Sequence, residues 1–138
     1  MDSMEYFSIG WRAENSIKEL EKIKNREKGN RTTLEDAYDL VKPFISIAEK
    51  NLEKVVGKPN FGILIRLVYG GKGETITNPE ELKKIKKRMS DISVTGIVME
   101  DILREIEVSD ANLDIAIKTF GYLNDKCLEY SQPERRCF

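Results

Sequence analysis

"TLEDAYDLVKPFISIAEKNLEKVV", residues 33–56, is the stretch that decides the fold. Apolar residues recur in it at intervals of three and four from Leu34 to Val55, which places them on one face of an α-helix. Other apolar residues widen this face, so we expect the helix to be central and buried on more than one side. Pro43 lies well inside the pattern and removes one backbone hydrogen bond, so we expect the helix to bend there.

The sequence also predicts a helix on the N-terminal side of this stretch. Residues 13–24 carry apolar residues at steps of four and three, again on one stripe. Residues 28–33 have the composition of a loop. Thr32 is followed three residues later by Glu35, which is a capping-box pattern, so the central helix is predicted to begin directly after Thr32.

Three more helices are predicted on the C-terminal side. Asn78 is a good capping residue and Pro79 suits the first helical position, so a helix is expected to begin there. A break at residues 90–93 is expected to separate this helix from another one over residues 94–106. Ser109 is then predicted to cap the last helix, which keeps the spacing of three and four.

The segment between the central helix and these helices is ambiguous. Residues 61–69 form a short apolar run that favours a buried helix, although the same residues alternate well enough for a strand in a small hairpin. Residues 70–77 are predicted to be a glycine-rich connector. They do not match a phosphate-binding loop, because Lys72 precedes Gly73 and Glu74 adds negative charge.

One resemblance falls on the same segment. Residues 60–62, Asn-Phe-Gly, and the glycine pair at 70–71 resemble the start and the end of the first homology helix in the Bcl-2 apoptosis regulators. The resemblance implies a groove that captures an amphipathic peptide helix. That family places an arginine directly after the first glycine, whereas this chain has Ile63, and we do not assign the chain to the family.

Taken together, these signals predict an all-α protein, a single compact bundle of five to six helices. At 138 residues the chain is long enough for one substantial core and too short for two. We therefore expect residues 1–131 to form one helical domain and residues 132–138 to form a flexible C-terminal tail.

The composition removes several kinds of chemistry. The chain contains no histidine, so nucleophiles activated by an imidazole cannot be built, and its two cysteines cannot complete a zinc site. We expect no cofactor and two reduced thiols. No stretch approaches the roughly 18 consecutive apolar residues of a membrane span. We therefore expect a cytoplasmic protein with no membrane partner.

The carboxylates raise one enzymatic alternative. Several acidic residues lie three or four positions apart on predicted helices, and two facing helices with such pairs could hold Mg²⁺, as in all-helical nucleotide hydrolases. A structural account is better, because some of them lie in a first helical turn, where the helix dipole favours acids, and the others lie outside the apolar stripes. The pairs and groups are Glu35 with Asp36 and Asp39, Glu49 with Glu53, Asp101 with Glu105, and Asp110 with Asp114.

A basic run raises a second alternative. Five cations occur within six residues on the outer side of one predicted helix, and such a face could bind nucleic-acid phosphates. The total charge is nearly balanced, with 23 basic and 24 acidic residues, which argues against nucleic-acid binding as the main role but leaves room for a local patch. A solvated face, or pairing with the acids of residues 100–114, would also account for the run. Its members are Lys83, Lys84, Lys86, Lys87 and Arg88.

The preferred hypothesis rests on apolar residues in excess of one core. Phe7 and Trp11 fall opposite the main stripe of the first helix, so either that helix bends at Gly10 or its first turns present a second apolar face. Aromatic residues outside a core are typical anchors of protein interfaces. With Tyr69 as a third candidate, they predict a non-enzymatic interaction or regulatory protein that binds a protein partner or itself, most simply as a homodimer.

Overall fold

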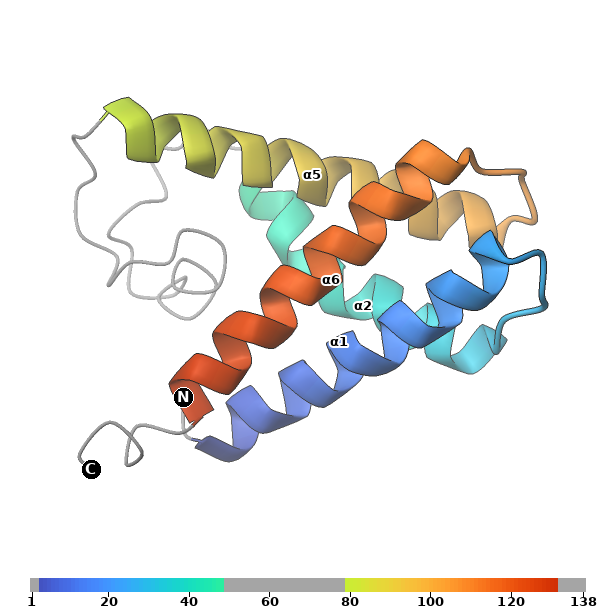
Figure 1. Ribbon diagram of the computed structural model, residues 1–138, viewed down its shortest axis with the longest axis horizontal. Coiled ribbons are helices and arrows are strands. Elements are labelled where there is room, and N and C mark those ends of the chain that lie inside the picture. Colours follow the sequence, from blue (N-terminus) through green and yellow to red (C-terminus); the bar gives the residue numbers. More distant parts are fainter. Residues whose placement is uncertain (1–2, 49–78, 132–138) are drawn as a thin grey trace.

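The computed structural model describes residues 3–48 and 79–131, which form four α-helices and no strand (Figure 1). This part of the chain confirms the all-α prediction. The helices are α1 (Ser3–Lys24), α2 (Arg31–Ala48), α5 (Pro79–Leu103) and α6 (Asp110–Ser131).

The four helices form two hairpins that pack on each other. Short turns join α1 to α2 and α5 to α6, and both turns lie at the same end of the bundle (Figure 1). The most extensive packing joins the first helix to the last, α1 to α6, followed by α2 to α5. The approach of Gly10 to Cys127 near one end of the α1–α6 pair, and of Lys24 to Asp114 near the other, shows that these two helices are antiparallel.

The core follows the predicted stripes of α1, α2 and α6. Along each helix, residues three and four positions apart face the centre of the bundle, where removing them from water stabilises the fold. On α5, Val98 and Met99 are buried in the core, and Val94, Ile102 and Leu103 pack against it, because α5 contacts both α2 and α6. The largest fully buried side chains are Phe120, Leu20, Met99, Leu113, Leu123, Val41 and Val98.

The predicted break at residues 90–93 is wrong. α5 runs without interruption from Pro79 to Leu103, so the two helices expected there are one. Ser93 and Thr95 donate their hydroxyl hydrogens to the carbonyl oxygens of Met89 and Asp91, at 3.1 and 2.7 Å. The hydroxyls are satisfied by the helix itself and do not start a turn.

The turn between α1 and α2 corrects a second prediction. α2 is capped by Asn30, two residues before the expected position, because its Oδ1 accepts a hydrogen bond of 3.0 Å from the backbone N–H of Thr33. The helix consequently begins at Arg31 rather than after Thr32. The equivalent prediction for α6 is confirmed, since Ser109 Oγ accepts a hydrogen bond from the N–H of Asn112.

Both hairpin turns begin in the same way. Arg26 and Glu105 have positive φ angles of 64° and 61°, in the left-handed region. The N–H of the following residue bonds back to the last turn in each case, from Glu27 to Lys22 O and from Ile106 to Asp101 O. This is the Schellman arrangement that ends many helices, built here without glycine.

Glu19, a residue of α1, stabilises the first hairpin turn through a hydrogen bond to its backbone. It is buried, and its Oε2 accepts a hydrogen bond of 2.9 Å from the backbone N–H of Asn30, while its Oε1 is paired with the ammonium of Lys22. The bond from Asn30 lowers the pKa of Glu19 below its ordinary value of 4.5, outweighing the effect of burial, and Lys22 lowers it further.

This arrangement makes part of the stability dependent on pH. A lowered carboxyl pKa stabilises the folded state above the ordinary value of 4.5, and the contribution is lost as the pH falls through the folded value. Glu19→Gln is expected to cost about 1–2 kcal/mol at neutral pH and clearly less in acid. Urea unfolding of both proteins across the acid range measures this. If the free energies of unfolding of the two proteins differed by the same amount at every pH, the charge of Glu19 would not be the source of the stabilisation.

Two glycines mark places where helices come close together. α1 is continuous through Gly10, and Phe7 and Trp11 are exposed, so its first turns present a second apolar face. A methyl group built on Gly10 would lie 3.1 Å from Cβ of Cys127 on α6. One built on Gly96 of α5 would overlap Cδ1 of Ile45 on α2 and lie 3.0 Å from its Cγ1. A side chain at Gly10 would require a small shift of its neighbours, and one at Gly96 would require Ile45 to move.

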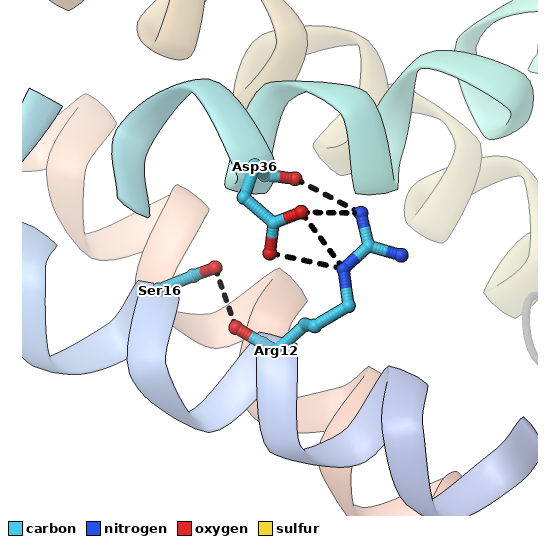
Figure 2. Close-up of polar contacts among 3 residues, drawn as sticks. All are labelled: Arg12, Ser16 and Asp36. Carbon is cyan, nitrogen blue, oxygen red and sulfur yellow. Dashed lines mark hydrogen bonds and ion pairs between the residues drawn. The ribbon is translucent and has the colours of Figure 1, made fainter. Parts of the chain in front are cut away.

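A polar contact joins α1 to α2 on the outer side of this packing (Figure 2). Arg12 Nε donates to both carboxylate oxygens of Asp36, at 3.0 and 2.9 Å, and its Nη2 lies 2.8 Å from Oδ1 and 3.3 Å from the backbone oxygen. Ser16, buried beside it, donates to Arg12 O at 2.7 Å. The guanidinium fork thus fixes the relative position of the two helices more specifically than a lysine would.

Several predictions lie outside the described residues. They concern residues 49–56 of the central helix, the apolar run 61–69, the glycine-rich connector 70–77 and the tail 132–138. Pro43 does lie within α2, on its exposed side. The bend at Pro43, the central position of this helix and the single-domain organisation stay predictions.

Candidate interaction surfaces

Four large apolar side chains are exposed along α1 and the end of α6. Phe7 and Trp11, the two predicted interface residues, are 63% and 59% exposed. Met4 on the preceding turn is 74% exposed, and Leu128 on α6 is 57% exposed. We call these four residues the apolar surface. The spacing of three and four along α1 puts its three members on one side of that helix.

A small hollow of about 160 Å³ lies within the apolar surface. Phe7, Trp11 and Leu128 line it, and its lining includes the closest approach of α1 and α6, where Gly10 meets Cys127. Burial raises the pKa of the Cys127 thiol to about 11, so this thiol stays protonated at neutral pH and contributes to packing rather than to reaction.

A second hollow, of about 270 Å³, lies between α5 and α6 and has the opposite character. α5 contributes Lys84, Lys87 and Arg88, and α6 contributes Lys118 and Tyr122. We call these five residues the basic groove. One carboxylate, that of Asp91, is also part of the lining, so four cations face one anion.

An aromatic ring orients one of these cations. The guanidinium carbon of Arg88 lies 4.0 Å from the centroid of the Tyr122 ring, a cation–π contact. The ammonium of Lys126, one turn further along α6, lies 5.8 Å from the same centroid. Tyr122 thus holds positive charge from both helices beside the groove.

The lysines of the basic run, like several lysines elsewhere in the described residues, lie apart from carboxylates. Among residues 3–48 and 79–131, no carboxylate lies within ion-pair distance of the lysines at positions 83, 84, 86, 87 and 118. Several cations near the hairpin turns are paired, as in Lys24 with Asp114 and Arg104 with Glu100, although Lys28 in the first turn pairs with no described carboxylate. Within the described residues, the groove lysines therefore form no ion pair, and Asp91 is the one carboxylate in the lining of their hollow.

Intramolecular pairing of the basic run with the acids of residues 100–114, one of the alternatives for that run, does not occur within the described structure. Arg88 and Glu100 are 12 positions apart on one continuous helix, which separates them by about 18 Å along its axis. Glu100 pairs with Arg104, while Asp110 and Asp114 pair with cations at the end of α1. The α5–α6 hairpin is therefore acidic near its turn and basic at its other end.

The structure divides the predicted site residues among these surfaces. Phe7 and Trp11 lie together, whereas Tyr69 is outside the described residues. Lys83 and Lys86 are exposed but do not line the groove, unlike the three other members of the basic run. Four residues of the two surfaces were not predicted from the sequence: Met4, Leu128, Lys118 and Tyr122. The available signal for Lys118 and Tyr122 was their spacing of four on α6, which places them on one side of the helix outside its apolar stripe.

The acidic groups proposed as Mg²⁺ ligands are placed differently. Asp36 is bound by Arg12 and Glu35 pairs with Arg31, so each has a protein cation beside it. Within the described ranges, no three carboxylate, thiol or imidazole groups are close enough together to hold a metal ion.

A third hollow lies where the two hairpin turns meet. It measures about 520 Å³ and is lined by both turns, with cations such as Arg26 and Arg31 and acids such as Glu105 and Glu107. Its charges are mixed and Arg26 and Arg31 are already paired with acids, so it favours no particular ligand.

Comparison with known proteins adds no functional assignment. No family model, no curated protein sequence and no solved structure matches the chain. Of the helices in residues 3–48 and 79–131, none combines the length and the apolar character needed to cross a lipid bilayer.

Proposed function

We propose that this protein acts by contact with other protein chains and that it forms a homodimer through the apolar surface. The observation that supports this proposal is the grouping of Met4, Phe7, Trp11 and Leu128, all more than half exposed, on two adjoining helices. Each Å² of apolar area that an interface removes from water contributes about 25 cal/mol. Such a group of side chains therefore favours a partner.

A second copy of the chain is the simplest partner. A two-fold dimer needs only one self-complementary surface, because the same patch contacts its equivalent on the other copy. α1 and α6 are antiparallel neighbours, so two such pairs can pack face to face as a four-helix bundle. Phe7 and Trp11 would supply the aromatic anchors that dominate the energy of many interfaces.

The chain contains one tryptophan, which makes Trp11 a direct reporter of the proposed contact. As the protein concentration rises, its fluorescence maximum is expected to shift to shorter wavelength while sedimentation velocity shows a monomer converting to a dimer. Phe7→Ala is expected to weaken the dimer by about tenfold or more, because the loss of an anchor commonly costs over 1 kcal/mol. Its helical content should be unchanged.

Ile97→Ala is the matched control, because Ile97 is 58% exposed on α5 and lies outside the apolar surface. It is expected to leave both the dimer and the fluorescence shift unchanged. A wild-type protein that sediments as a monomer at every concentration, with a constant emission maximum, would refute the dimer. Equal weakening by both variants would assign the contact to another surface.

A further inference from the structure

The basic groove carries an inference that is independent of the proposed dimer. Its cations come from two helices that are distant in sequence and are brought together only by the packing of the α5–α6 hairpin. Concentrating like charges in one place is unfavourable for the isolated protein, since each raises the free energy of the others. The arrangement is therefore best explained by a negatively charged ligand.

The exposure of these cations indicates which anion fits. Lys84, Lys87 and Lys118 are exposed, and a single small anion gains little from exposed lysines in water of high dielectric constant. A polyanion gains from every cation that it meets, because each contact releases a condensed counterion. The groove residues therefore suit a chain of phosphates better than one phosphate.

The positive surface also extends beyond the groove. Lys83 and Lys86 are exposed on the adjoining side of α5, whereas Lys126 on α6 is paired with Glu129. Arg88, held against the ring of Tyr122, offers a guanidinium fork whose geometry matches the oxygens of a phosphate. Glu100 and Asp110 lie near the hairpin turn, away from this end, whereas Asp91 lines the groove and Glu129 lies at the end of α6.

We propose that the basic groove binds the phosphate backbone of a nucleic-acid strand without reading its sequence. The strand lies across α5 and α6, with Lys84, Lys87, Arg88 and Lys118 each beside a phosphate. Four such contacts predict that the logarithm of the binding constant falls with the logarithm of the salt concentration with a slope of about −3 for a single strand.

Fluorescence anisotropy with a labelled single-stranded oligonucleotide, and with the corresponding duplex, tests the proposal. The substitution K84E/K87E/K118E reverses three groove lysines and is expected to weaken binding by about tenfold or more at low salt and to flatten the salt slope. The control K18E/K28E/K42E reverses three exposed lysines outside the groove, with the same change in net charge. It is expected to retain most of the affinity and the slope.

Each other outcome contradicts the proposal. Absence of binding at low salt, or equal loss in the two triple variants, would show that the groove is not the site. Full competition by inorganic pyrophosphate at low concentration would make it a pocket for a small phosphate ligand. Polyglutamate that binds as tightly as the oligonucleotide would point to acidic proteins, including the acidic end of a second copy. Circular dichroism of every variant verifies that it is folded.

Discussion

Phe120→Ala should lower the free energy of unfolding by about 3–5 kcal/mol, the largest effect expected of any single substitution described for this protein. Phe120 lies in α6, is completely buried and is the largest of the fully buried side chains. Removing the ring loses the free energy of transfer from water and leaves a cavity that rigid neighbouring helices fill only in part. Because typical domains are stable by about 5–15 kcal/mol, the variant is expected to lose a large share of its stability.

Urea denaturation followed by far-ultraviolet circular dichroism measures this loss. Leu128→Ala is the control on the same helix, because Leu128 is 57% exposed and its truncation should change the stability by less than about 0.5 kcal/mol in the monomer. The measurements are made below the concentration at which any dimer forms, so that Leu128→Ala reports on the stability of the monomer alone. A loss of under about 1 kcal/mol for Phe120→Ala would mean that α6 is not packed as described.

Gly96→Val is expected to cost about 1–3 kcal/mol, although replacing a helical glycine usually stabilises a helix. A side chain at this position would overlap Ile45, so α2 and α5 would have to separate or Ile45 would have to leave its preferred rotamer. α5 would retain its helical propensity, and the loss would come from packing alone.

Gly121→Val provides the opposite case on α6. A methyl group built on Gly121 meets no atom within 4 Å, so this substitution is expected to be neutral or slightly stabilising. Thermal and urea unfolding are therefore expected to show a lower free energy of unfolding for Gly96→Val and an unchanged or slightly higher one for Gly121→Val. Two equal effects would show that the crossing of α2 and α5 is looser than the contact with Ile45 indicates.

Much of the fold follows from local patterns in the sequence. The stripes through Ala13, Leu20, Val41 and Phe120 predict buried residues correctly, because a helix alone determines which of its residues share a face. The continuity of α5 could not be predicted in the same way. A hydroxyl such as that of Ser93 can begin a helix or bond to the previous turn, and tertiary packing decides between the two.

The candidate surfaces show the same limit. Phe7 and Trp11 could be identified from their angular offset along one helix, and the basic run from composition. Leu128, Lys118 and Tyr122 belong to α6, and their neighbours on α1 and α5 are far away in the sequence. Finding them requires knowing which helices pack together, and the periodicity of a single helix carries no information about its partners.

The extensive packing of α1 against α6 has a consequence for how the protein is made. The ribosome produces α1 first of the four described helices and α6 last. During translation α1 can pair with α2, but the residues that later face α6, such as Gly10, stay uncovered until α6 has been made. Such late closure slows folding relative to a helical protein with mainly local contacts, and it exposes the nascent chain to aggregation.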